Sequence, residues 1–348
     1  MTSVAVASCE VAVVGGGPAG ALCAFWLARA GLPVTLVLGL RRFSPVEFVS
    51  GRARRALEQA LGPGLLEQTG GVELVETVSR WGGSEPLSWS ALCCPWGAGF
   101  AVDRATLDSH LVRCAEQAGA RVLADCEVRS ARRQSGGWQL QLRGAAQPLL
   151  VSRFLVLATG QRARPLVERP RPAAPEQIAL LARLHGRRAP SAFFLDALPE
   201  GWGYLLPDPA GGSFAGLCAG ADVARRLPRR LGDAFWNTLA GSELLAPQLA
   251  GSKLEPLLWR CATGPLRQGS AAGDGWMAVG DAAFCSDPLS GMGIDFAIES
   301  ARLAARTLQG SSRERGLREY RRAVADHADH HERSGARERA NARRTEAS

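Results

Sequence analysis

Three glycines near the start of the chain have the spacing of a turn that binds a pyrophosphate. Residues 15–20 read Gly-Gly-Gly-Pro-Ala-Gly, so the pattern G-x-G-x-x-G is satisfied. Residues 10–14 predict a buried strand before the turn, and residues 21–30 predict a helix after it. In such a turn the glycines allow a tight bend, a close approach of the backbone to phosphates, and packing of the helix on the strand. We therefore predict that a dinucleotide binds at the helix start, on Gly15, Gly17, Pro18, Ala19 and Gly20.

A second candidate segment, residues 275–293, combines glycines and carboxylates with the start of a helix. It reads Gly-Trp-Met-Ala-Val-Gly-Asp-Ala-Ala over 275–283 and Asp-Pro-Leu-Ser-Gly-Met-Gly over 287–293. Apolar residues then recur at helical spacing from Ile294 to Leu308, which predicts a helix directly after Gly293. The free amides of a helix start would stabilise negative charge on a bound group.

The strand predicted at 34–38 lacks the acidic residue that binds the adenosine ribose in dinucleotide folds. Leu38, Gly39 and Leu40 stand at that place. Ribose recognition must then use backbone, water or another side chain, and we expect the cofactor to be held less tightly than usual. Arg41 and Arg42 either contact the adenosine end or are exposed loop arginines without a ligand.

Residues 100–160 predict a return of the chain to the nucleotide-binding sheet. Residues 105–117 have the spacing of an amphipathic helix. Arg104 precedes it and either points at the cofactor or lies in solvent beside a helix-capping Asp103. Strands are expected near 121–128, at 138–142 and at 154–157. Val128 ends the first of these strands, and Gly160 follows the last.

A short aromatic strand is the best candidate for the wall of a substrate pocket. Residues 202–207 read Trp-Gly-Tyr-Leu-Leu-Pro. Alternate residues of a strand share one face, so Trp202, Tyr204 and Leu206 should lie together. The surrounding stretches, 71–99 and 161–263, contain many aromatic residues punctuated by proline and glycine, which predicts a substrate-binding sheet with covering helices.

Composition excludes several classes of protein. The 348 residues are 46% hydrophobic and 21% charged, as in a soluble globular chain and unlike a fibrous or disordered one. The net charge is +8, and Lys253 is the only lysine. The basic residues form no stripe interleaved with aromatic residues, so we expect an anionic cofactor and no nucleic acid. No segment has the pattern of a membrane span or a secretion signal, so we expect a cytoplasmic protein without stable membrane insertion.

Cysteines and histidines offer no convincing metal site. The nine cysteines include no C-x-x-C pair and mostly have apolar neighbours, which indicates core thiols, and the adjacent Cys93 and Cys94 could bond only with strain. The tail from residue 311 predicts an exposed helix followed by disorder. His327, His330 and His331 fall on one face of that helix, which we interpret as a solvated face and not as a metal site.

Taken together, residues 15–20, 103–104, 158–160 and 280–293 resemble the FAD-dependent aromatic monooxygenase superfamily, which also contains flavin-dependent halogenases and geranylgeranyl reductases. The resemblance implies an α/β fold, with a Rossmann-type FAD-binding domain of the glutathione-reductase kind and an inserted mixed β-sheet substrate domain. It places the FAD-binding domain in 1–70, 100–160 and 264–310, the substrate domain in 71–99 and 161–263, and a C-terminal helix with a charged tail in 311–348.

The resemblance also implies which residues bind FAD. Asp281 would bond the ribityl chain, and Gly291 and Gly293 would approach the isoalloxazine closely. Further contacts are implied for the glycine turn and for Arg41, Arg104, Val128, Gly160, Gly280, Pro288 and Met292.

The implied reaction is hydroxylation of an electron-rich aromatic substrate. Reduced flavin would react with O2 to a C4a-hydroperoxide, whose distal oxygen is attacked by the ring of a small molecule or by a tryptophan of a partner protein. Because the chain has no second G-x-G-x-x-G, electrons would come from NAD(P)H visiting the flavin or from a partner flavin reductase.

Related activities of the superfamily are alternatives. Halogenases resemble W-x-W-x-I-P and geranylgeranyl reductases Y-x-W-x-F-P where this chain has W-x-Y-x-L-P. A halogenase also needs a lysine in the early substrate region, and no lysine precedes Lys253. Residues 196–202 and 220–222 are similar to a monooxygenase-like subgroup that includes flavoproteins hydroxylating a tryptophan of a partner protein. A prenyl-chain reductase with a long apolar tunnel, a halogenase, and a flavin-binding protein without turnover stay open.

Overall fold

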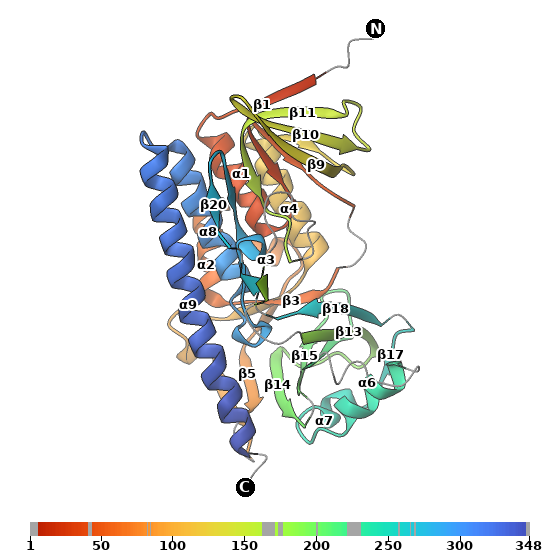
Figure 1. The fold of residues 1–348 in the computed structure, drawn as a ribbon. Helices are drawn as coiled ribbons and strands as arrows, with labels where there is room; N and C mark the ends of the chain where they lie inside the picture. The colour runs from red at the N-terminus through yellow and green to blue at the C-terminus, as the bar shows by residue number, and fades with distance from the viewer. Residues whose placement is uncertain are drawn as a thin grey trace.

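Two large β-sheets organise the molecule in a computed structural model of the chain (Figure 1). The structure describes residues 6–40, 44–81, 83, 85–161, 171–172, 177–199, 201–220, 231–256, 258–264, 266–267 and 269–345.

The first sheet, here called the parallel sheet, has a core of parallel strands in the order β21-β11-β1-β2-β8, as a Rossmann-type fold requires. Strands β9 and β10 continue antiparallel from β11, and β20 flanks β21. The first strand begins before residue 10 because residues 6–9 pair with β11. The strands are β1 (Val6–Val14), β2 (Val34–Val37), β8 (Arg121–Leu123), β9 (Glu127–Gln134), β10 (Gly137–Arg143), β11 (Leu149–Leu157), β20 (Ala272–Gly273) and β21 (Trp276–Ala278).

Helix α1 (Pro18–Arg29) connects β1 to β2 and begins three residues before the predicted start at residue 21. Proline at the first helical position fixes a helical φ and has no amide hydrogen to leave unpaired, so the helix can start directly after the glycine turn. Gly17 is its N-cap residue in an extended conformation.

Three further helices complete the layer beside the parallel sheet. Helix α1 packs against both α4 (Arg104–Gln117) and α8 (Gly293–Gln309), and α9 (Arg313–Thr345) runs along α8 (Figure 1). Tyr320, Val324 and Ala328 are buried at a spacing of four residues, and the Tyr320 hydroxyl donates to the carbonyl oxygen of Ala278. The predicted exposed helix followed by disorder is therefore wrong, because an apolar stripe docks this helix and it continues to Thr345.

The second sheet, here called the mixed sheet, has the order β17-β13-β16-β15-β14-β5-β6, with β18 also on β13. All its pairs are antiparallel except that of β14 with β5. One face packs on α6 (Leu231–Ala240) and α7 (Ala246–Leu249). The strands are β5 (Glu76–Arg80), β6 (Leu87–Ser90), β13 (Gln177–Gly186), β14 (Ala192–Leu198), β15 (Gly201–Pro207), β16 (Ser213–Gly220), β17 (Ser252–Leu254) and β18 (Trp259–Thr263).

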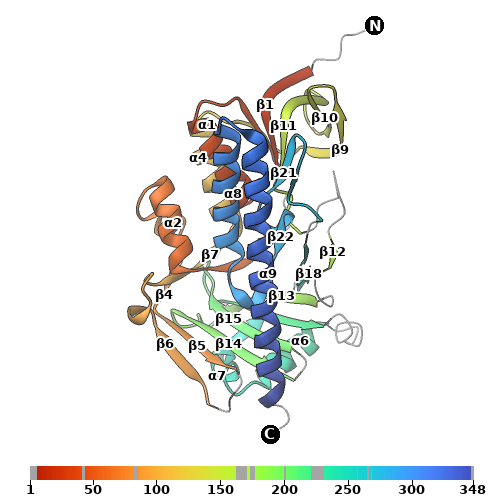
Figure 2. The same cartoon turned by 60° about the vertical axis from the view of Figure 1, so that its left-hand side comes forward.

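A three-stranded sheet, β3-β7-β4, lies between the two large sheets (Figures 1 and 2). Its strands are β3 (Val46–Val49), β4 (Val72–Leu74) and β7 (Gly99–Asp103). A second small sheet has the order β12-β19-β22, with β12 (Arg171–Pro172), β19 (Leu266–Arg267) and β22 (Phe284–Cys285). The short helices are α2 (Gly51–Leu61), α3 (Leu65–Gln68), η1 (Ala91–Cys93), η2 (Gly280–Ala282) and η3 (Pro288–Ser290).

The fold is thus a Rossmann-type α/β unit with an additional mixed sheet, as the sequence predicts. The exact domain boundaries given above stay a prediction. None of the helices in the described ranges combines the length and the hydropathy that crossing a bilayer requires.

Candidate functional site

The glycine turn closes against the end of strand β11. Gly15 has a φ of +117°, and a Cβ on it would lie 2.1 Å from the carbonyl oxygen of Ala158. A Cβ on Gly20 would lie 1.9 Å from the carbonyl oxygen of Gly15. Both positions therefore require glycine. The amides of the first turn of α1 have no partner within the helix and are available to phosphate oxygens.

Leu38 fills the place where a ribose-binding acid was expected. A Cβ on Gly16 would lie 2.3 Å from Cδ2 of Leu38, so this side chain packs directly over the turn. An apolar contact to the turn thus stands where other dinucleotide folds place a carboxylate.

Arg104 links the glycine turn to strand β3. Its guanidinium donates to Glu47 (2.7 Å) and to Asp108 (3.2 Å), and a Cβ on Gly17 would lie 3.7 Å from its Nη2. Burial lowers the pKa of Arg104, but the two carboxylates outweigh burial and leave this pKa above its ordinary value. Asp103 caps α4 by accepting from the amide of Thr106 (3.0 Å). The capping interpretation is confirmed, whereas the solvent position for Arg104 is wrong, since the carboxylates hold it at the turn.

Asp281 lies on η2, close to the charges of Arg104 and Glu47. Burial raises the pKa of Asp281 to about 6, the charge of Glu47 raises it as well, and Arg104 lowers it. Its carboxylate accepts no hydrogen bond from the residues that the structure describes. Such a group is suited to accept from hydroxyl groups of a ligand, because these would replace the water that burial removes.

The segment after Asp281 leads to an open helix start. Asp287 accepts from the amide of Leu289 (3.1 Å) and caps η3, and Gly291 then turns the chain with a φ of +60°. Met292 precedes α8 without a side-chain cap, and a Cβ on Gly293 would meet nothing within 4 Å. A planar group therefore has room to approach these amides.

Four aromatic side chains, here called the aromatic row, extend from this turn into the mixed sheet. A Cβ on Gly291 would lie 3.6 Å from Cδ1 of Phe48 on β3. Phe48 stacks on Phe193 of β14, with ring centroids 5.2 Å apart, and Phe193 meets Tyr204 edge-on at 6.1 Å. Tyr204 and Trp202 lie 5.7 Å apart, which confirms that they share a face of β15. Burial raises the pKa of Tyr204 well above its ordinary value, so its phenol stays neutral.

Two buried thiols, Cys218 and Cys285, lie near this site. Gln161, directly after Gly160, donates from Nε2 to Sγ of Cys285 (3.1 Å). Burial raises the pKa of Cys285 and of Cys218 well above the ordinary value, so neither supplies a thiolate at neutral pH. Cys93 and Cys94 are both free and exposed.

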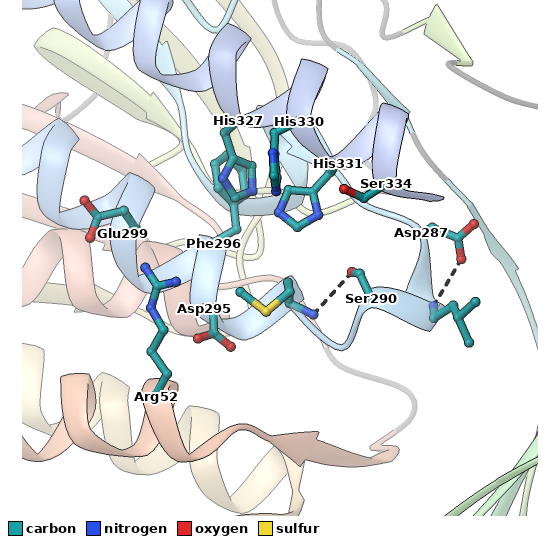
Figure 3. Close-up of a pocket in the computed structure, with 12 residues that line it drawn as sticks. Arg52, Asp287, Ser290, Asp295, Phe296, Glu299, His327, His330, His331 and Ser334 are labelled. Carbon is teal, nitrogen blue, oxygen red and sulfur yellow. Dashed lines mark hydrogen bonds between the residues drawn. The ribbon is translucent and has the colours of Figure 1, made fainter. Parts of the chain in front are cut away.

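A cavity of about 430 Å³ opens between the start of α8 and α9 (Figure 3). Histidines point into it from α9, and Arg52 reaches it from α2. Carboxylates of α8 and of the segment that precedes it also line the cavity. The ionisable lining residues are Arg52, Asp287, Asp295, Glu299, His327, His330 and His331.

The histidines of this cavity are held by aromatic contacts. His327 stacks on Phe296 with ring centroids 4.3 Å apart, and the His331 ring lies 4.3 Å from that of His327. Burial and the two neighbouring histidines lower the pKa of His327 to about 4. The predicted solvated face is therefore wrong for His327, because Phe296 covers it. Across the described ranges, no group of three His, Cys, Asp or Glu side chains could hold a metal ion.

Most of the predicted cofactor residues converge on one place. This place is surrounded by the glycine turn, Arg104, Asp281 and the segment from Pro288 to Gly293. A Cβ on Gly160 would meet nothing within 4 Å, so the space beside this residue is open. Val128 lies apart from these contacts, partly buried on β9 against the core. Arg41 and residues 221–222 lie outside the described residues. The binding role of each residue stays a prediction.

Sequence reasoning missed Glu47 and Phe48. Both belong to β3, a four-residue strand that carries no motif. The available signal was a single acid inside the apolar run Val-Glu-Phe-Val, directly before a capped helix.

Comparisons with known proteins identify the cofactor. Residues 8–168, which contain the glycine turn and Arg104, match the family described as FAD binding domain. A solved peptidyl tryptophan dihydroxylase, QhpG, which is essential for tryptophylquinone cofactor biogenesis, superposes with a TM-score of 0.77 at 27% identity over 97% of this chain and 76% of that one. The chain thus matches the superfamily of FAD-dependent monooxygenases, halogenases and reductases.

Other proteins that this chain resembles differ in the reaction that their names describe. Menaquinone reductase of Mycobacterium tuberculosis is 29% identical over 324 residues, covering 86% of this chain and 76% of the reductase. The myxobacterial chondrochloren halogenase CndH superposes with a TM-score of 0.84 at 22% identity, over 91% of this chain and 79% of the halogenase. The chain is thus an FAD-dependent oxidoreductase, and its relatives include reductases, halogenases and a dihydroxylase.

The superfamily cofactor fits the residues present. The glycine turn and the charged Arg104 would hold the pyrophosphate, Asp281 would accept from the ribityl hydroxyls, and the uncapped start of α8 would face the isoalloxazine. The amides of that helix start would favour negative charge on the reduced ring.

Proposed function

We propose that this chain is an FAD-dependent monooxygenase that hydroxylates an electron-rich aromatic ring. The observation that carries the proposal is the aromatic row, which begins against Gly291 and runs to Trp202. Bound FAD, once reduced, would supply the two electrons with which O2 inserts one oxygen atom into the ring while the other leaves as water.

The side chains of the row have two tasks in this reaction. Ring faces and edges bind a flat aromatic substrate by offset and edge-on contacts. They also exclude water from the turn at Gly291, which suppresses the release of hydrogen peroxide in place of product. Tyr204 keeps its proton and can donate one hydrogen bond to the substrate without becoming charged.

The place of the single lysine supports hydroxylation over halogenation. QhpG, named as a peptidyl tryptophan dihydroxylase, shares 27% identity with nearly the whole chain. The superfamily halogenation mechanism needs a lysine amine in the early substrate region, and the only lysine is Lys253 on β17. The exposed place of Lys253 on the outer strand of the mixed sheet, away from the aromatic row, also disfavours that role.

Reduction of a prenylated substrate is the second candidate, and the relation to menaquinone reductase favours it. The two functions differ in their need for O2. Under anaerobic conditions a reductase would oxidise reduced flavin with menaquinone, whereas a monooxygenase would leave the flavin reduced.

The decisive assay supplies photoreduced FAD enzyme, O2 and a panel of indoles and phenols, with and without bromide, and reads product masses. We expect a gain of one oxygen atom without dependence on halide. NAD(P)H and a flavin reductase are then compared as electron donors. Halide-dependent products, or turnover of menaquinone only, would overturn the proposal.

The variant Trp202→Ala tests the aromatic row directly. FAD binding and flavin reduction should be unchanged, and substrate binding should weaken by about 1–3 kcal/mol through lost ring contacts. The fraction of flavin oxidation that yields product should fall. Trp138→Phe, in the core of the parallel sheet, is the matched control, and equal coupling in both variants would contradict this role of Trp202.

A further inference from the structure

Strand β6 is an exposed sheet edge without a charged residue. It reads Leu-Ser-Trp-Ser, ends the mixed sheet and pairs, among the described residues, with β5 alone (Figure 2). All four of its residues are exposed, with Leu87 56% and Trp89 52% accessible. Such an edge presents unpaired backbone amides and carbonyls to any extended chain.

The other described edge strands of three or more residues are protected. Strand β17 carries the only lysine, Lys253, and β18 carries Arg260. Strand β8 begins with Arg121, and β9 carries three arginines. In the described sheets, every edge strand of three or more residues except β6 carries a charged side chain, since β3 and β4 contain Glu47 and Glu73. Charged edges oppose pairing with other chains, and β6 lacks that protection.

The exposed edge is continuous with the aromatic row. Trp89 pairs with Thr77 of β5, and Thr77 pairs with Phe193 of β14. Directly paired residues share a face of the sheet, so Trp89 lies on the same face as Phe193 and Tyr204. Two strand spacings, about 10 Å, separate the backbones of β6 and β14.

The charges around β6 select the kind of partner. Residues 71–99 contain three acids, Glu73, Glu76 and Glu85, and one base, Arg80, a local net charge of −2 in a chain of +8. Arg80 is already paired with Asp196 and Glu243. This local excess of acidic residues disfavours an anionic bilayer and favours a polypeptide with basic residues.

We propose that β6 binds an extended, basic segment of a partner protein by backbone pairing, and that this docking presents an aromatic side chain of the partner to the aromatic row. The substrate class is then a polypeptide. This inference rests on the proposed hydroxylase function for its chemistry, but the docking itself is independent of turnover.

The test measures peptide binding to the FAD-loaded enzyme by fluorescence anisotropy. The probe is a fluorescein-labelled peptide of about ten residues that alternates threonine and valine, with one central tryptophan and a lysine at each end. We expect saturable binding, weakened about tenfold or more by Trp89→Lys. The matched control Gln134→Lys adds a lysine to the exposed end of β9 and should bind within about twofold of wild type. A peptide with alternate backbone amides methylated should fail to bind.

Several results would overturn the inference. One is that the peptide shows no saturable binding to the enzyme at about 1 mM. Another is that the Trp89→Lys variant binds the peptide as tightly as wild type does. A third is that the methylated peptide binds as well as the unmethylated one. Self-association of the enzyme through Trp89 that the peptide does not displace would assign the edge to a second copy. Trp89-dependent binding to phosphatidylglycerol vesicles would assign it to a membrane.

The two proposals fail in different ways. If Trp89 governs peptide binding but neither the peptide nor small aromatics gain oxygen, the hydroxylase function is wrong and the docking edge stands. If small aromatics are hydroxylated while Trp89 has no effect on the peptide, the docking edge is wrong and the function stands.

Discussion

Asp281 is a half-buried carboxylate without a described hydrogen-bond donor, next to a fixed positive charge on Arg104. A carboxylate without a donor favours the binding of a ligand whose hydroxyl groups can donate hydrogen bonds to it. Asp281→Asn should remove a charge-assisted hydrogen bond of about 1.5–3 kcal/mol and weaken FAD binding roughly tenfold to a hundredfold. Titration of FAD-free protein by flavin fluorescence measures the effect. Asp274→Asn, at a carboxylate that is 92% exposed, is the control and should bind FAD like wild type.

The pKa of Asp281 also makes the stability of the FAD-free protein depend on pH. In the folded chain this pKa is about 6, above the ordinary value of 3.8. The group therefore contributes stability that is fully present below pH 3.8 and lost as pH rises through about 6. Asp281→Asn should be more stable than wild type above pH 6 by on the order of 1–2 kcal/mol, and this advantage should vanish towards pH 4. Urea unfolding across that range checks it, and a pH-independent difference would show that this carboxyl is not the titrating group.

The elements themselves were predictable wherever one local signal acts alone. The stripe from Ile294 to Leu308 predicts α8, and its residues Ile294, Ala297, Ile298, Ala301, Ala305 and Leu308 are all buried. Alternation predicts the shared face of Trp202 and Tyr204. Prediction was wrong where packing between distant segments decides: β1 extends to Val6 because β11 pairs with it, and α9 stays ordered because the core receives its apolar stripe.

The docking of α9 supplies a test at this scale. Tyr320 is 2% exposed, and its hydroxyl donates to the carbonyl oxygen of Ala278, at the end of the strand that leads to Asp281. Tyr320→Phe should lower the free energy of unfolding by about 1–2 kcal/mol, because a buried carbonyl loses its donor. Arg322→Gln on the exposed side of the same helix should change it by less than about 0.5 kcal/mol. Equal effects in urea unfolding would mean that the hydroxyl bond does not hold α9.

The candidate site was predictable only in its cofactor half. Glycine turns and helix starts leave a signature in sequence because backbone geometry restricts the residue type, as at Gly15 and Gly20. The aromatic row has no such signature, since Phe48 and Phe193 lie far apart in sequence and meet only through tertiary packing. Pairing of β3 with β7, and of β14 with β5, brings them together.

At the scale of the whole molecule, Phe48 links the predicted cofactor site to the aromatic row. It belongs to β3, whose neighbour Glu47 binds Arg104 at the glycine turn, and its ring packs on Phe193 of the mixed sheet. The predicted cofactor site and the aromatic row are thus positioned by one short strand. A smaller side chain at position 48 should therefore uncouple oxygen activation from substrate binding. The parallel sheet and the mixed sheet should both stay folded.

Phe48→Leu measures that coupling. Leucine keeps much of the volume but loses ring stacking worth about 0.5–1.5 kcal/mol, so KM for an aromatic substrate should rise about threefold to tenfold. FAD affinity should stay within about twofold, because the contacts of Glu47 and Arg104 are retained. Hydrogen peroxide should increase at the expense of product, since water reaches the turn at Gly291.

Phe194→Leu is the matched control: it lies beside Phe193 on the opposite face of β14, in the core under α6. That variant should lose stability without losing coupling, and equal peroxide release from both would show that the strand between the sheets does not govern the reaction.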